Sequence, residues 1–164
     1  MAKASDIRIT TRRTRVCASP SGAKQGRAVK ADTSRKKELF FDCFAESYFE
    51  TAIWADRPEG CYAGDVWPGC IPEILADCHR FQEENRRLLE CAYGLTRVDA
   101  GEGRLYDVTD AGHDFLLSRN GHGTGYLDRG LGKIGEMLHE AAQAYGGVDV
   151  LPDKIGRREW LFIE

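Results

Sequence analysis

Residues 112–130 read GHDFLLSRNGHGTGYLDRG, the most distinctive stretch of the chain. Two strand-like runs, 114–119 and 124–127, lie on either side of Asn120-Gly121. An Asn-Gly pair between such runs is the strongest short-range signal of a β-hairpin, because both residues tolerate a positive φ. Asp128 follows directly and suits the N-cap of a helix. This stretch therefore predicts a hairpin that leads into a helix.

The rest of the chain adds helices before this stretch and strands after it. Apolar residues recur at helical spacing over 34–54 and 72–92, which predicts an N-terminal antiparallel helix pair. A short hairpin is expected over 96–108, a third helix over 128–145, and a terminal hairpin from 148–151 and 159–163. The sequence thus predicts an α+β fold, in which the third helix packs on a small antiparallel sheet.

Charge divides the chain into two parts. Residues 1–37 contain eleven Lys and Arg residues and two acidic residues, which gives this segment a net charge of +9. Because the whole chain carries −3, residues 38–164 carry −12. We expect residues 1–36 to form a basic, flexible tail and residues 37–164 to form a single domain. Such a tail is typical of a solvated segment, and equally of one that contacts nucleic acid, here through Arg12, Arg13, Arg15, Lys36 and Lys37.

Composition excludes several classes of protein. Apolar residues make up 42% of the chain and charged residues 30%, as in ordinary globular proteins. No run approaches 18 uncharged apolar residues, and the N-terminus lacks the apolar segment of a secretory signal, so we expect a cytoplasmic protein without a membrane span. The six cysteines show no recurring short spacing, so we expect reduced thiols and neither a structural metal nor another cofactor.

Residues 113–129 concentrate side chains that carry chemistry. Two imidazoles, two carboxylates and two guanidinium groups in this range would suit a general base, an orienting acid and an anion clamp. Metal-dependent phosphohydrolases that use a His-Asp pair draw further ligands from other helices, and no such ligands are evident in this chain. A turn or a binding surface is therefore favoured over catalysis, with the candidate binding residues His113, Asp114, Arg119, Asn120, His122, Asp128 and Arg129.

The same stretch resembles a motif of small uncharacterised bacteriophage and prophage proteins, which reads roughly GHDFWLTRNGHGAGFWDRGLG. The likeness continues through Leu131-Gly132 and the third predicted helix to 148–150, and extends more loosely back to 49–52 and 77–81. The chain has Leu116 and Leu127 where the family often has Trp. The resemblance implies a phage origin, but it implies no mechanism, because the family has no assigned activity.

Residues 94–112 read GLTRVDAGEGRLYDVTDAG and resemble the wing of a winged-helix repressor. In such a repressor the wing is a hairpin whose basic tip lies against DNA phosphate. Here the tip carries Asp99 and Glu102, which would repel DNA, and no three-helix unit with a basic recognition helix precedes it. This resemblance implies a DNA-binding regulator that uses the basic tail and the 95–108 hairpin.

These observations favour a phage-encoded accessory protein of the host cytoplasm that acts by binding and not by catalysis. Its acidic body would suit a host or phage protein with a basic surface, as expected of a host-directed or anti-defence factor. A winged-helix-like DNA-binding regulator is the second interpretation. A small hydrolase centred on His113–Arg129 is the third.

Overall fold

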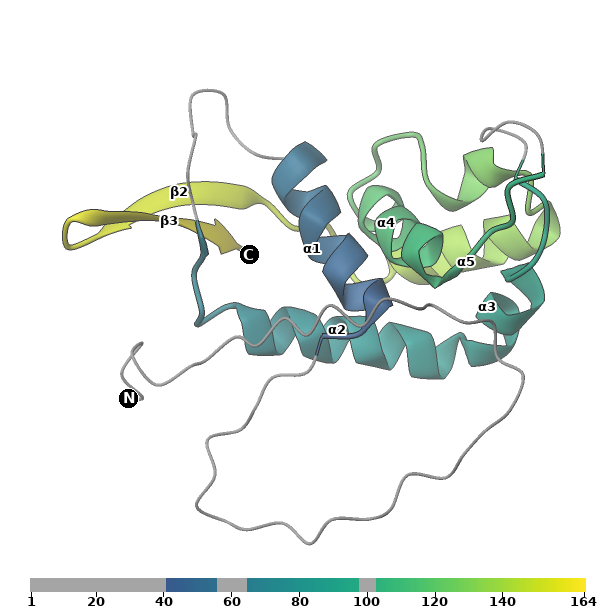
Figure 1. Ribbon diagram of the computed structural model, residues 1–164, viewed down its shortest axis with the longest axis horizontal. Helices are drawn as coiled ribbons and strands as arrows, with labels where there is room; N and C mark the ends of the chain where they lie inside the picture. The colour runs from purple at the N-terminus through teal and green to yellow at the C-terminus, as the bar shows by residue number, and fades with distance from the viewer. Residues whose placement is uncertain (1–40, 56–64, 98–102) are drawn as a thin grey trace, which may run out of the picture. The chain divides into compact units, whose positions relative to one another are not determined.

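A computed structural model of the protein describes residues 41–55, 65–97 and 103–164 (Figure 1). These residues belong to one compact unit, and the fold is α+β, as predicted. The predicted basic tail lies outside the described residues. The elements are α1 (Cys43–Ala55), β1 (Asp65–Val66), α2 (Ile71–Glu84), α3 (Arg86–Ala92), α4 (Val108–Arg119), the 3₁₀ helix η2 (Tyr126–Arg129), α5 (Lys133–Gln143), β2 (Val150–Ile155) and β3 (Arg158–Ile163).

The core is built where α1 crosses α4, the most extensive helix contact of the unit. Gly112 makes this contact close, because a Cβ at that position would lie 2.1 Å from the carbonyl oxygen of Phe44. The rings of Phe81 and Phe115 stack beside the crossing with centroids 4.1 Å apart, and Phe44 lies 5.7 Å from Phe115. All three phenylalanines are fully buried, so α2 joins α1 and α4 in a single aromatic core.

The main departure from the sequence prediction is α4, because residues 114–119 form its second half and not a strand. Asp107 caps this helix by accepting hydrogen bonds from the backbone N–H groups of Thr109 and Asp110, over 2.9 and 3.0 Å. The Asp110 carboxylate accepts the Asp107 N–H in return, which completes a capping box. The run 115–117 is buried throughout, and a continuous apolar run fits a buried helix as well as a buried strand.

Asn120-Gly121 ends α4 instead of turning a hairpin. Gly121 has a φ of +68°. The His122 N–H donates to the Leu117 carbonyl over 3.1 Å, and the Gly121 N–H donates to the Ser118 carbonyl over 3.3 Å. These two bonds define a Schellman motif, in which the residue after the cap needs a positive φ. The same dipeptide therefore suits both structures, which explains why the hairpin prediction was wrong.

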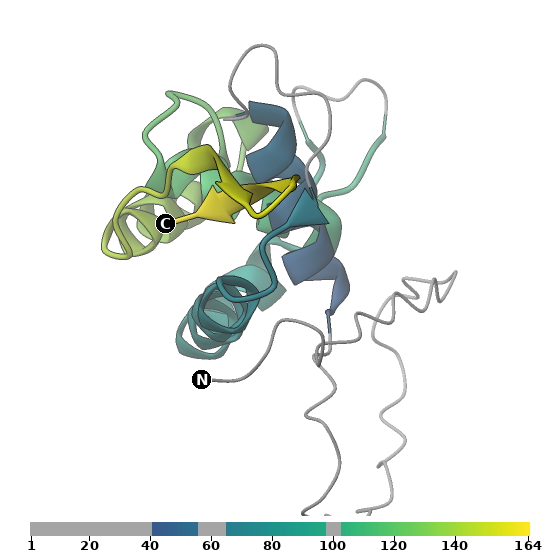
Figure 2. The ribbon, with the colours of Figure 1, turned by 90° about the vertical axis from the view of Figure 1, so that its left-hand side faces the viewer.

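The predicted N-terminal helix pair differs in length and in packing. The described helix α1 begins at Cys43, and the predicted start near Ser34 lies outside the described residues. The second predicted helix is divided at Asn85, whose φ of −106° and ψ of 17° separate α2 from α3. Helices α1 and α2 cross at a steep angle instead of lying antiparallel (Figures 1 and 2), since α1 packs mainly on α4.

The third predicted helix is confirmed as α5, but it begins later than expected. Asp128, its predicted N-cap, lies in η2, and α5 begins at Lys133 after Gly132. Leu138 and Ala142 are fully buried, as their spacing predicted. Helix α5 packs mainly against α4, α3 and η2, so its apolar face belongs to the helical core and not to the sheet.

The terminal hairpin is confirmed, because β2 and β3 pair antiparallel with Val150 opposite Ile163. Strand β2 is longer than predicted, since residues 152–154, expected in the connection, pair with β3 and the turn lies at 156–157. The short strand β1 pairs parallel with β3, which gives the sheet order β1-β3-β2. Trp67 follows β1 and packs against Trp160 and Phe162, with ring centroids 5.2 and 5.7 Å away. Among the described residues, no helix combines the length and apolar character that a membrane crossing requires.

Candidate functional site

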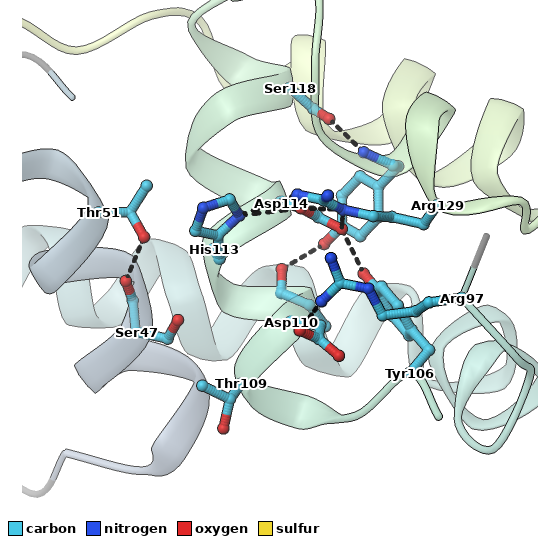
Figure 3. A network of polar contacts seen from close by, with 12 residues as sticks. Ser47, Thr51, Arg97, Tyr106, Thr109, Asp110, His113, Asp114, Ser118 and Arg129 are labelled. Atoms are coloured by element: carbon cyan, nitrogen blue, oxygen red, sulfur yellow. Dashed lines mark hydrogen bonds and ion pairs between the residues drawn. The ribbon is translucent and has the colours of Figure 1, made fainter. Parts of the chain in front are cut away.

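Asp114 is the centre of a polar network on α4 (Figure 3). Its side chain is 0% exposed, and it accepts N–H bonds of 2.7–3.0 Å from the guanidinium group of Arg129. The Nδ1 atom of His113 lies 3.0 Å from its Oδ1, and the Tyr106 hydroxyl donates to its Oδ2 over 3.1 Å. Burial raises the pKa of Tyr106 well above its ordinary value, so the phenol stays protonated. Both Asp114 oxygens therefore accept bonds from within the protein.

Arg129 reaches Asp114 because η2 is fixed against α4. Tyr126, the first residue of η2, is fully buried, and its backbone N–H donates to the Ser118 Oγ over 3.2 Å. Gly125 precedes it with a φ of +107°, and a Cβ there would lie 2.6 Å from the same Oγ. This close approach places Arg129, at the end of η2, beside the middle of α4.

Asp110 forms a second cluster with two arginines from the segment before α4. The Arg97 N–H donates to the Arg104 carbonyl over 2.9 Å, and Thr96 pairs antiparallel with Leu105, which agrees with part of the predicted 96–108 hairpin. The turn residues 100–102 lie outside the described residues, and Asp107 caps α4 and Val108 begins it instead of extending a strand. Both guanidinium groups donate to the Asp110 carboxylate. The bond from Arg104 measures 2.8 Å, and Arg97 donates to the same oxygen. Both arginines thus contact α4, whereas the basic residues of a repressor wing contact DNA phosphate.

These two clusters line a hollow of about 340 Å³, which we call the arginine hollow. Three arginines line it, and among the described residues the carboxylates of Asp110 and Asp114 bond them. Three guanidinium groups thus gather at one place in a body that carries −12 over residues 38–164. Such a surface suits a carboxylate or phosphate group. The lining residues are Ser47, Arg97, Arg104, Thr109, Asp110, His113 and Arg129.

A second hollow, of about 510 Å³, adjoins the first, because His113 and Arg129 line both. We call it the tryptophan hollow, after the side chain of Trp54, which is 76% exposed. Two of the predicted site residues, His122 and Asp128, are exposed and lie here. Its other lining residues are Ala55, Leu117 and Thr124.

Arg119 and Asn120, also predicted as site residues, hold the fold together and line neither hollow. Arg119 is 7% exposed, and it donates to the Gly146 carbonyl over 2.7 Å and to the Tyr48 hydroxyl over 2.9 Å. The Asn120 side chain donates to the Val148 carbonyl and accepts the Val148 N–H, both over 2.9 Å. The two side chains thus join α4 to α1 and to the segment that leads into β2.

The sequence predicted His113, Asp114 and Arg129, which the structure brings together, but it did not predict Arg97, Arg104 or Asp110 as site residues. A local signal for Asp110 was present, because Asp107 and Asp110 have the spacing of a capping box. A helix that begins at 108 places 110, 113 and 114 on one face, since residues three and four apart are neighbours. The two arginines approach through tertiary contacts, which spacing does not reveal.

Comparison with models of protein families, with curated proteins and with solved structures gave no match to this chain. Within residues 41–55, 65–97 and 103–164, no group of three or more His, Cys, Asp or Glu side chains is placed to hold a metal ion. What the site binds is therefore inferred from its own side chains.

Proposed function

We propose that this protein is a bacteriophage or prophage accessory protein that acts by binding an anionic group in the arginine hollow, and not by catalysis. The arginines of this hollow carry the proposal, because three guanidinium groups gather at one place within an otherwise acidic body. Guanidinium groups bind carboxylate and phosphate oxygens through paired, charge-assisted hydrogen bonds. The resemblance of residues 112–130 to the phage motif supports a bacteriophage or prophage origin.

The geometry of the network supports binding over catalysis. A general base must come within about 3 Å of the group whose proton it removes. Asp114 is 0% exposed, and its oxygens already lie within 3.1 Å of donors from Arg129 and Tyr106. Asp110 is 5% exposed and is bonded by two arginines. We assign these carboxylates the role of holding the arginines in position.

The charge of the wider surface narrows the kind of partner. Residues 38–164 carry −12, so they attract a basic surface, such as that of a host or phage protein, and repel a polyanion. The arginine hollow gathers three guanidinium groups within this field. This combination favours a single anionic group over the many phosphates of duplex DNA.

The test is a titration of the full chain with inorganic phosphate, followed through amide shifts in ¹H–¹⁵N NMR spectra. We expect saturable shifts at Thr109 and Asp110, and binding weakened by about fivefold or more in Arg104→Ala. Arg80→Ala is the matched control, because Arg80 is similarly exposed (59% against 52%) and also bonds one aspartate, but does not line the hollow. Absence of saturable shifts, or equal weakening by both substitutions, would refute the proposed site.

A further inference from the structure

We infer that the ligand of this site is a free mononucleotide, with its phosphate in the arginine hollow and its base in the tryptophan hollow. This inference rests on the proposed function, because it needs an anion in the first hollow. His113 and Arg129 line both hollows, so the two adjoin, and one ligand with two parts can contact both. Their volumes, about 340 and 510 Å³, lie in the range of small-molecule sites.

The tryptophan hollow has the features of a base site. The exposed fraction of Trp54, 76%, is the largest among the exposed hydrophobic side chains of the described residues. A base that stacks on an aromatic ring gains roughly fivefold to a hundredfold in affinity. Leu117 adds apolar surface, while Thr124 and Asp128 bring polar atoms that can hydrogen-bond to the edge of a base. An aromatic ring without polar edges, such as that of phosphotyrosine, would leave these atoms without a match.

The arginine hollow fits the other half of the ligand. Arg104, which is 52% exposed, and Thr109, an exposed residue, stand at its accessible side, and Ser47 adds a second hydroxyl group. Arginine and hydroxyl groups are common donors to phosphate oxygens. Because Arg129 borders both hollows, a phosphate near it leaves the attached nucleoside within reach of the tryptophan hollow.

Charge favours a free mononucleotide over a nucleic-acid strand. Proteins that bind single strands use a positive groove that follows the backbone. Here Arg97 and Arg104 line one hollow, the adjoining hollow contains Asp128, and residues 38–164 carry −12. Further phosphates of a strand would therefore meet a repulsive surface, whereas a mononucleotide brings only one.

The experiment titrates the full chain with inorganic phosphate, deoxythymidine and deoxyadenosine monophosphates, and a short oligothymidylate, followed by NMR amide shifts. We expect at least one mononucleotide to bind about tenfold more tightly than phosphate. Trp54→Ala should remove this advantage and leave phosphate binding unchanged, and Trp54→Phe should restore most of it. Leu151→Ala is the control, because Leu151 is also an exposed apolar residue, 47% exposed, and lines neither hollow.

The outcomes separate this inference from the proposed function. If phosphate binds and neither mononucleotide binds more tightly, the inference is wrong and the proposed function stands. If neither phosphate nor a mononucleotide binds, both are wrong. Mononucleotide binding that is unchanged in Trp54→Ala overturns the assignment of the base site. Tighter, strongly salt-dependent binding of the oligothymidylate identifies a strand as the ligand and overturns the free mononucleotide.

Discussion

Replacing Gly112 by Ala tests the close backbone contact between α1 and α4. The new Cβ would lie 2.1 Å from the Phe44 carbonyl oxygen, and real Cβ atoms essentially never approach below 3.0 Å, so the helices must separate by about 0.9 Å. Overpacking costs about 1–3 kcal/mol, and we expect the upper end because backbone atoms cannot change rotamer. The higher helix propensity of Ala returns about 1 kcal/mol, which leaves a net loss of about 2 kcal/mol.

Urea unfolding followed by circular dichroism measures this loss, which corresponds to a melting temperature lower by about 4–10 °C. Ala76→Gly is the matched control, because Ala76 is exposed in the middle of α2 and reports the propensity difference alone. We expect this control to lose about 1 kcal/mol. Ala is thus the more stabilising residue at position 76 and Gly at position 112. A Gly112→Ala variant at least as stable as the wild type would refute the close contact.

Three further predictions concern stability. Asp114→Ala should lower the free energy of unfolding by about 3–5 kcal/mol, because it leaves the Arg129 charge buried without this carboxylate; a loss below about 1 kcal/mol in urea would contradict the network. Gly121→Val should cost about 1–3 kcal/mol in the same assay, because it forces a β-branched residue to a φ of +68°, and unchanged stability would argue against the Schellman motif. Burial raises the pKa of Tyr106 and Tyr126 well above 10.0, so their contribution to stability is complete below pH 10 and is lost as the pH rises further. Urea unfolding at several pH values checks this pH dependence, and phenolate absorbance provides a second signal. Ionisation of all tyrosines before the protein unfolds would contradict the prediction.

Local signals predicted much of the fold and failed where two structures share one signal. The β2–β3 hairpin and the third helix followed from strand-like runs and from helical spacing, which are properties of the segments themselves. The helix α4 was missed because the run 115–117 is buried throughout, and a continuous apolar run fits a buried strand as well as a buried helix. Asn120-Gly121 then supported the wrong choice, since a positive φ serves a hairpin turn and a helix end alike.

The candidate site was predictable only in part. His113 and Asp114 were identified from one dense segment, but Arg119 and Asn120 of the same segment serve a different purpose. Successive residues of a helix are rotated by about 100°, so side chains five or six positions apart point in different directions. Once α4 is known to be a helix, the separation of His113 and Asp114 from Arg119 and Asn120 follows. The arrival of Arg97 and Arg104 at Asp110 depends on the tertiary structure.

The pairing of β2 with β3 leaves the outer edge of β2 poorly suited to accept another strand. Asp149 and Glu164 exchange both backbone hydrogen bonds, so the alternation of an antiparallel pair turns the N–H groups of residues 150, 152 and 154 outward. Pro152 has no N–H, and the N–H of Lys154 donates to the Asp153 carboxylate over 2.7 Å. Two of the three outward positions thus offer no donor to a second molecule, and the lysine adds a charge. The hairpin is thereby protected against edge-to-edge aggregation.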